Sequence, residues 1–246
     1  MNAVNQRVRW RIFTRVDDCS TVPYWHSCGC NTYPWRTLVG LREALRHRIM
    51  AFDVNLREHA MGHAEQKAVF TASDYLAWEA AQSERHEFVG GEVFAMAGAE
   101  DRHVTVGGNI YMALRQHLSG SPCRTFMSDM KLHVTATNQY FYPDVMVTCS
   151  ALDLASPLAK SEPKLIIEVL SPSTAAYDRG LKFGYYRALP SLQEYVLIDL
   201  DTRSTDCYRK GEHGLWVLHP FNSGEAVSLA SVALEISAAV LFAEVA

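Results

Sequence analysis

The stretch Lys164-Leu-Ile-Ile-Glu-Val-Leu170 decides the fold, because a nearly continuous apolar run of this length is typical of a strand buried on both faces. A helical pattern follows over residues 175–188 and is closed by Pro190, which cannot continue a helix. A second buried strand is predicted directly afterwards, over residues 194–199. A strand, a helix and another strand in this order predict a sheet that helices cover.

The rest of the chain from about Phe70 carries alternating helix and strand patterns. Helices are predicted over residues 71–82 and 101–118, the second with apolar residues at helical spacing. Strands are predicted over residues 87–96, as a hairpin turning at Gly90-Gly91, and over 125–134, 142–149, 205–209 and 215–219. The fold class expected from this order is a single α/β or mixed α+β domain, with a mixed β-sheet flanked by helices.

The composition is that of a folded globular protein. Of the 246 residues, 48% are hydrophobic and 20% are charged, which excludes an intrinsically disordered chain. No uncharged apolar run reaches the roughly 18 residues that a membrane span needs. We therefore expect a soluble protein without a membrane partner.

The first 60 residues differ in charge from the remainder. They hold nine Arg, no Lys and five acidic residues, for a net charge of +4, whereas the remainder carries −8. This composition is typical of a transit peptide, but Asp17 and Asp18 argue against one, and the sequence shows no apolar segment of a secretory signal. We expect residues 1–60 to be a poorly ordered extension, or a start assigned too early with Met61 as the natural start. Residues 61–246 are expected to form the folded domain.

The six cysteines favour a reducing compartment. Those in the first 60 residues could hold zinc together with His26, although they lack the paired Cys-x-x-Cys spacing of many zinc sites: they are Cys19, Cys28 and Cys30. The others are odd in number and widely spaced, so no disulfide framework is expected: they are Cys123, Cys149 and Cys207. A cytoplasmic location follows from this expectation.

Two acidic residues interrupt strands that should be apolar. Glu168 lies within the buried stretch quoted above, and Asp144 follows Pro143 at the start of the strand over 142–149. Burying an unpaired carboxylate costs several kcal/mol, so each acid needs a partner. Asp144 could cap the turn after Pro143, and Glu168 could pair with Arg187. Aimed at one point from neighbouring strands, the two would instead form a site for a hard divalent cation such as Mg²⁺.

Lys182 is the third candidate, on the helix that follows the Glu168 strand. With Asp178 it could form an ordinary i,i+4 ion pair on a solvated helix face. Alternatively it could reach back over the carboxylates, where its ammonium group would orient a water molecule and stabilise charge on a phosphoryl transition state. The spacing of the residues fits both interpretations equally.

As a set, these residues resemble the Uma-type family of putative restriction endonucleases, within the PD-(D/E)XK nuclease superfamily. The resemblance covers about residues 70–243 and rests on spaced residues of the family pattern: Glu87, His103, Asp144, Glu168, Asp178, Lys182, Tyr186 and Pro190. It implies a restriction-endonuclease-like core with a mixed sheet of four or five strands. It also implies a Mg²⁺-dependent endonuclease that hydrolyses phosphodiester bonds of DNA, with Mn²⁺ able to substitute.

The resemblance also implies roles for individual residues. The catalytic residues would be Asp144, Glu168, Lys182, Glu87 and His103, and the metal ligands would be Asp144, Glu168 and the backbone carbonyl of Val169. The superfamily signature places its lysine two residues after the glutamate, where this chain has Leu170. The family takes this cation from the following helix, which points to Lys182. Glu87 would be an auxiliary acid, and His103 a proton carrier or a helix-capping residue.

The net charge of −8 over residues 61–246 opposes nucleic-acid binding, because neutralisation of phosphates by basic residues supplies most non-specific affinity. A local basic patch could still line a cleft, formed by Lys131, Lys164, Arg179, Lys182 and Arg187. The alternative function is a catalytically inactive nuclease-like module that binds nucleic acid or protein, which Leu170 favours and the two buried acids disfavour. A Ser or Cys hydrolase would need a Gly-x-Ser-x-Gly elbow, which the sequence lacks. A homodimer would suit double-strand cleavage.

Overall fold

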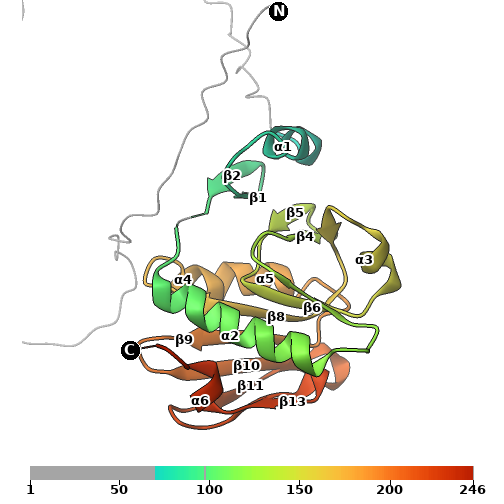
Figure 1. Cartoon of the computed structure of the whole chain (residues 1–246). Coiled ribbons are helices and arrows are strands. Elements are labelled where there is room, and N and C mark those ends of the chain that lie inside the picture. The colour runs from blue at the N-terminus through green and yellow to red at the C-terminus, as the bar shows by residue number, and fades with distance from the viewer. Residues whose placement is uncertain (1–69, 97, 246) are drawn as a thin grey trace, which may run out of the picture. The chain divides into compact units, whose positions relative to one another are not determined.

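The computed structural model describes residues 70–96 and 98–245 (Figure 1). The expectations for residues 1–60, including the zinc ligands and the extension, lie outside the described residues. No helix in the described part of the chain is long and apolar enough to cross a membrane.

A six-stranded mixed sheet forms the centre of the described domain. Its spatial order is β11 (Trp216–Phe221), β10 (Ser204–Lys210), β9 (Glu194–Asp199), β8 (Pro163–Leu170), β6 (Val145–Thr148) and β3 (Arg124–Met127). Only the β8–β9 pair is parallel, and the other neighbours in this sheet are antiparallel. The quoted stretch therefore lies in a central strand, β8, seven of whose eight residues are buried.

Helices cover both faces of this sheet, as Figure 1 shows and as the apolar run predicted. The helix α2 (Asp101–His117) packs Val106, Ile110 and Leu114 on one face, against every second residue of β8. The opposite face is covered by a helical segment over residues 175–186, whose Phe183 and Tyr186 pack on it. Because strand side chains alternate between faces, Glu168 shares this second face with Ile166 and Leu170.

The segment over 175–186 is a helix with a π-type turn inside it. The short helices α4 (Ala175–Tyr177) and α5 (Phe183–Tyr186) flank the π-turn η1 (Asp178–Lys182). The predicted helix over 175–188 is confirmed in position, and its local winding differs. Such turns insert an extra residue and are frequent at functional sites, since they redirect side chains.

A second sheet holds the N-terminal part of the domain. Its order is β2 (Glu92–Ala95), β1 (His86–Val89), β5 (Gln139–Phe141), β4 (Lys131–Val134) and β7 (Ala159–Lys160). The predicted hairpin at Gly90-Gly91 is confirmed as β1–β2, with both glycines at positive φ. The predicted helix over 71–82 is confirmed as α1 (Ala72–Glu79), which begins at a capping box of Thr71 and Asp74 and packs Tyr75 on Phe88.

Two predicted strands are wrong in their continuity. The strand over 125–134 is split into β3 and β4, because the chain turns between Met127 and Met130 and passes from one sheet to the other. The strand over 142–149 contains only β6, because Pro143 lacks the N–H that a strand ladder requires. In place of the expected sheet of four or five strands, the structure has one sheet of six strands and one of five.

Several short elements had no clear signal in the sequence. They are α3 (Ala151–Ala155), β7, the β12 (Val227–Leu229) and β13 (Leu234–Ile236) pair, the 3-10 turns η2 (Glu212–Gly214) and η3 (Ala230–Val232), and α6 (Ala238–Leu241). The predicted C-terminal hairpin is confirmed as β10–β11.

The expectation of no disulfide among the downstream cysteines is wrong. Cys123 and Cys149 form a disulfide, 26 residues apart in sequence. They meet because Arg124 pairs with Thr148 in the antiparallel β3–β6 ladder, which places the adjoining cysteines opposite each other. Cys207 is a free, buried cysteine on β10. The spacing argument failed since two strands of one sheet bring distant residues together.

Candidate active site

Asp144 and Glu168 lie side by side because they belong to adjacent strands. Asp144 immediately precedes β6, whose Val145 pairs with Ile167 of β8. The backbone N–H of Asp144 donates to Glu168 Oε2 at 3.3 Å, and the backbone N–H of Val169 donates to Asp144 Oδ2 at 2.8 Å. The Glu168 carboxylate is therefore held by the backbone of Asp144 and the Asp144 carboxylate by the backbone of Val169, and neither carboxylate is paired with Arg187 among the described residues.

Lys182 reaches these carboxylates from the π-turn η1. Its Nζ lies 3.0 Å from Glu168 Oε1 and 3.4 Å from Asp178 Oδ1. The i,i+4 pair with Asp178 is thus present, but it is buried rather than solvated, since the Lys182 side chain is only 8% exposed. Lys182 therefore forms the i,i+4 ion pair with Asp178 and also reaches the carboxylate of Glu168, so the two interpretations of its spacing are compatible.

Glu87 and His103 join the group from two further elements. Glu87, on β1, places Oε1 3.2 Å from Lys182 Nζ. His103, in the first turn of α2, places Nε2 3.2 Å from Asp144 Oδ2. The five residues predicted from the sequence therefore come together from five separate parts of the fold, although their chemical roles are not tested by this proximity.

Two neighbours complete the group: the sequence indicated Asp178 through its i,i+4 spacing from Lys182, and Tyr186 only through the family pattern. Tyr186 donates its hydroxyl to Glu168 Oε1 at 2.9 Å, and its side chain is fully buried. The Asp178 carboxylate is also buried, and its Oδ1 accepts no hydrogen bond from the described residues, although it lies beside Lys182. Helical spacing from Lys182 could have identified both, since i−4 and i+4 positions lie on one helix face.

This group of residues contains more acidic than basic side chains. Burial raises the pKa of Glu168 to about 8, with Asp144 and Asp178 adding to the effect and Lys182 opposing it. Burial lowers the pKa of Lys182, but its carboxylate neighbours outweigh this and raise it well above its ordinary value. For His103, burial opposes protonation, whereas the hydrogen bond and the charge of Asp144 raise the pKa overall. Extra positive charge would therefore be favourable here.

The available oxygen atoms fit a divalent cation that keeps several of its own waters. Both contacts of the Asp144 carboxylate use Oδ2, which leaves Oδ1 without a partner among the described residues. Mg²⁺ is commonly held by one or two carboxylates, with waters and phosphate oxygens at the other positions. Within residues 70–96 and 98–245, no group of three His, Cys, Asp or Glu side chains is placed to hold a metal ion, so an ion here would depend on two carboxylates. The two carboxylates thus suit a minimal magnesium site.

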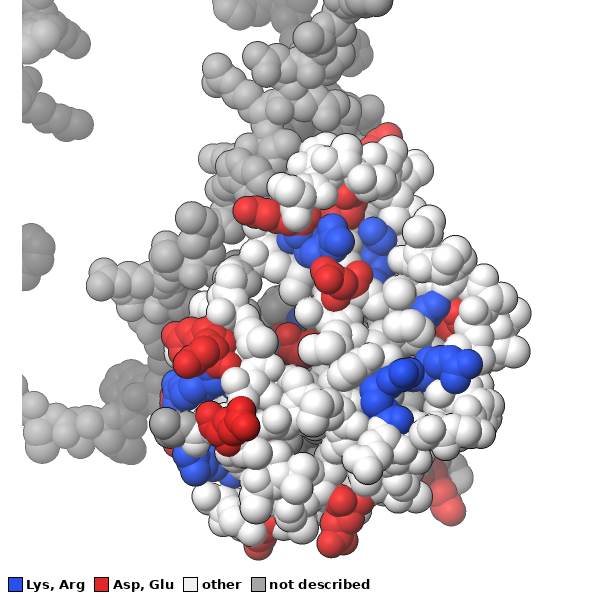
Figure 2. All heavy atoms as spheres, in the orientation of Figure 1, with Lys and Arg blue, Asp and Glu red and all other residues white. Residues whose placement is uncertain are grey.

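Access to the group is from the Asp144 side. The side chains of Asp144 and His103 are 17% and 18% exposed, whereas that of Glu168 is 4% exposed. Figure 2 shows a hollow in one face of the molecule, with acidic and basic atoms inside it.

The expected basic patch does not form as a single free surface. Arg179 is paired with Asp199 and Asp206, and Lys182 is enclosed by carboxylates. Arg187 lies over the Phe183 ring, and Lys131 donates to the Tyr142 hydroxyl. These four cations are largely committed to the fold, and Lys164, the fifth member of the expected patch, is partly buried near the start of β8.

Comparisons with known proteins identify the family and the fold. The model of the Uma2 family, described as "Putative restriction endonuclease", matches residues 72–241. Two uncharacterised proteins of Synechocystis sp. are similar: one is 36% identical, covering 69% of this chain and 89% of its own length, and the other is 38% identical, covering 61% and 86%. A crystal structure titled as a putative nuclease belonging to DUF820, from Anabaena variabilis, has a TM-score of 0.56 at 18% identity, covering 70% of this chain and 97% of that chain. The last comparison supports a restriction-endonuclease-like fold.

Proposed function

The chain belongs to the Uma2 family, and from this premise we propose that it is a metal-dependent nuclease that hydrolyses phosphodiester bonds within DNA. One observation carries the proposal: Lys182 contacts Glu168, and the Glu168 carboxylate accepts from the backbone of Asp144. Two acids and a lysine in contact are the groups that such hydrolysis requires, although Leu170 occupies the usual place of the lysine.

In this proposal Asp144 and Glu168, with the Val169 carbonyl, would hold Mg²⁺, and Mn²⁺ would substitute for it. The bound ion would polarise the scissile phosphate and lower the pKa of the attacking water. Lys182 places a positive charge beside Glu168, where it orients that water and offsets charge that develops on the phosphate. Glu87 and Asp178 keep the Lys182 ammonium in position.

His103 has a supporting role in the same proposal. Its Nε2 is within hydrogen-bond distance of Asp144 Oδ2, so it can hold one oxygen of this carboxylate and leave the other for the cation. Its partial exposure also allows it to exchange a proton with solvent. We expect replacement of His103 to slow cleavage and replacement of Asp144 to abolish it.

The experiment is nicking of supercoiled plasmid by the full chain with Mg²⁺ or Mn²⁺. Asp144→Asn and Glu168→Gln remove charge with little change of shape, and we expect both to lose activity. Glu92→Gln is the control, because Glu92 is an exposed acid on β2 of the same hairpin that carries Glu87. We expect it to cut as the unaltered chain does.

Thermal unfolding of each variant separates loss of chemistry from loss of fold. Metal-dependent nicking retained by folded Asp144→Asn and Glu168→Gln would refute these roles. A folded, unaltered chain that binds DNA but cuts none under either metal would favour the alternative, an inactive nuclease-like binding module. The observation that favours this second function is Leu170, which stands where the superfamily signature has its lysine.

A further inference from the structure

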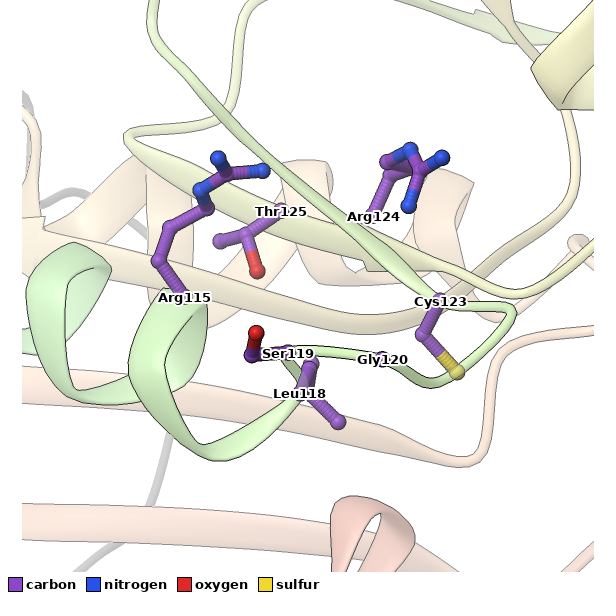
Figure 3. Close-up of a pocket in the computed structure, with 7 residues that line it drawn as sticks. All are labelled: Arg115, Leu118, Ser119, Gly120, Cys123, Arg124 and Thr125. Carbon is purple, nitrogen blue, oxygen red and sulfur yellow. The ribbon is translucent and has the colours of Figure 1, made fainter.

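A pocket between the end of α2 and the start of β3 is lined by none of the residues of the candidate active site (Figure 3). Its polar side chains do not converge, because Arg124 and Thr125 are neighbours on β3 and point to opposite sides of the strand. Arg115 and Arg124 are also exposed, so water solvates their charges. The hydrogen bond between Tyr186 and Glu168, in the candidate active site, differs on both points.

Tyr186 and Glu168 meet in the interior of the domain. Tyr186 is 0% exposed and Glu168 is 3% exposed. The Tyr186 hydroxyl donates to Glu168 Oε1 at 2.9 Å, which is its single side-chain hydrogen bond among the described residues. The ring is held edge to face against Phe141 and Tyr195, with centroids 5.3 and 5.4 Å away. Because the ring is fixed on two sides, its hydroxyl donates in a constant direction.

The two oxygens of the Glu168 carboxylate differ in their contacts. Oε1 accepts from Tyr186 and lies 3.0 Å from the Lys182 ammonium group. Oε2 has a single donor among the described residues, the backbone N–H of Asp144 at 3.3 Å. Each carboxylate oxygen has about two lone-pair sites, so Oε1 is filled by the protein and Oε2 keeps one site open.

Asp144 shows the same division between its oxygens. Its Oδ2 accepts from the backbone N–H of Val169 and contacts His103, whereas Oδ1 has no partner in the part of the chain that the structure describes. Each acid therefore has one oxygen that two groups of the protein hold and one that is left for a cation. The hydroxyl of Tyr186 completes this arrangement at Glu168.

Lys182 alone would fix Oε1 less firmly than the two donors do together. Its ammonium group is shared, since it also lies 3.2 Å from Glu87 and 3.4 Å from Asp178. It is a compact charge with rotatable donors, and a divalent cation beside Glu168 would repel it. The Tyr186 hydroxyl is uncharged and has no competing acceptor, so this hydrogen bond persists when positive charge is added nearby.

We propose that Tyr186 is a positioning residue for Glu168. Its hydroxyl holds Oε1, which keeps Oε2 available to the cation and leaves the Lys182 ammonium group for the attacking water and the phosphate. This inference rests on the proposed function, because the cation is the metal of that site. Tyr186 acts only through Glu168, since it is fully buried and has no exposed atom that a substrate could reach.

The first test measures metal binding in the absence of DNA. Mn²⁺ is titrated into the full chain, and the free ion is followed by its electron paramagnetic resonance signal. Tyr186→Phe removes only the hydroxyl, and we expect it to weaken Mn²⁺ binding by about 10–100-fold, the usual effect of losing a group that orients a metal ligand. Tyr75→Phe is the matched control, because Tyr75 is also fully buried but donates to the backbone carbonyl of His86. We expect this control to bind Mn²⁺ as the unaltered chain does.

The second test is plasmid nicking over a range of Mn²⁺ concentrations, below the unfolding temperature of each variant. For Tyr186→Phe we expect a higher half-saturating Mn²⁺ concentration and a rate near that of the unaltered chain at saturation, because the Glu168 carboxylate is still present. A merely structural role would lower the saturated rate in proportion to the unfolded fraction and leave the half-saturating concentration unchanged.

The inference is overturned if folded Tyr186→Phe binds Mn²⁺ as tightly as Tyr75→Phe does, or if both variants weaken binding equally. If Asp144→Asn has lost Mn²⁺ binding in the same series, the metal site stands and only the role of Tyr186 fails. If the unaltered chain binds no Mn²⁺, the proposed function fails, and the role of Tyr186 fails with it.

Discussion

Lys182 is surrounded by three carboxylates that come from three places in the fold. Glu87 lies on β1, Glu168 on β8 and Asp178 in the π-turn, and all contact the Lys182 ammonium within 3.4 Å. At the scale of single residues, this lysine therefore has two tasks that can be measured separately. It compensates buried negative charge, which concerns stability, and it faces Glu168, which concerns the proposed chemistry.

Lys182→Met should impair both stability and cleavage. Removing one member of a buried ionic group typically costs about 3–5 kcal/mol, because the other charges lose their compensation. We expect a decrease of this order in the free energy of unfolding measured with urea, together with loss of plasmid nicking. Lys210→Met is the control: Lys210 is partly exposed, its ammonium group donates only to the Pro190 carbonyl, and the variant should unfold at nearly the same urea concentration and nick plasmid as the unaltered chain does. A stable Lys182→Met variant would contradict the structural task of this lysine.

The buried thiol of Cys207 should make the free energy of unfolding decrease as the pH rises into the alkaline range. Burial raises the pKa of its thiol to about 12, above the ordinary value of 9.0 that applies to the unfolded chain. A raised pKa in the folded state stabilises the fold fully below the unfolded value, and this contribution is lost as the pH rises through the folded value. We therefore expect the unaltered chain to lose more unfolding free energy than Cys207→Ala between pH 8 and pH 11. Equal losses in urea titrations of the two would show that Cys207 is accessible.

The sequence identified the reacting groups of the candidate site better than it identified their partners. Glu168 and Asp144 stand out because a charged residue in an apolar strand must be compensated. The position of Lys182 required the family pattern, since an i,i+4 pair with Asp178 is equally expected on a solvated face. The π-turn could not be foreseen, because it is set by packing of the whole segment on β8 and not by local preference.

Among the helices of the described residues, α2 is the longest, and it carries His103 in its first turn. Two glycines, Gly107 and Gly108, lie in the middle of this helix, where glycine is unfavourable. A Cβ atom added at Gly108 would meet no other atom within 4 Å. A residue with a side chain at Gly108 could therefore make α2 more stable.

Gly108→Ala should raise the free energy of unfolding by about 0.4–1 kcal/mol, because alanine restricts the unfolded chain and fits the helix. Gly224→Ala is the contrasting variant, since Gly224 also has open space but a φ of +87°, where alanine is strained. We expect the second variant to be destabilised in thermal and urea unfolding. Stabilisation of both would mean that the loop at Gly224 adjusts its backbone.

The disulfide between β3 and β6 is the strongest local constraint on an edge of the central sheet. Closing a loop of this length restricts the unfolded chain by roughly 3 kcal/mol in the loop-entropy account. We expect the Cys123→Ser, Cys149→Ser double variant to unfold at lower urea concentration by a corresponding amount. Reduced and oxidised unaltered chains should differ similarly. No difference between them would indicate that the strand pairing alone holds this edge.

The elements predicted correctly are those with a strong local period or a clear end signal. The helix over 101–118 and the hairpin at Gly90-Gly91 belong to this class. The passage of the chain between two sheets at residues 128–130, and again at Pro143, was missed. Two consecutive strands in different sheets can show the same alternation of apolar and polar residues as one continuous strand. Only their pairing with strands far away in the sequence distinguishes the two cases.

At the scale of the whole molecule, the described domain holds one candidate active site. A single site of this kind cuts one strand of a duplex at each binding event. We therefore expect nicked circles at every protein concentration, and linear plasmid only where sedimentation shows a homodimer. Linear product formed by a monomer, without accumulation of nicked circles, would contradict a single site per chain.

The strand β6 connects several of these observations. It is hydrogen-bonded on both sides, to β3 and β8, its C-terminal end adjoins the Cys123–Cys149 disulfide, and its N-terminal end adjoins Asp144. Amide protons in such a strand exchange with deuterated water only when the sheet itself opens. The Asp144 carboxylate is thus attached to a segment whose amide protons we expect to exchange slowly, and its position should be kept through the local openings that loosen the surface.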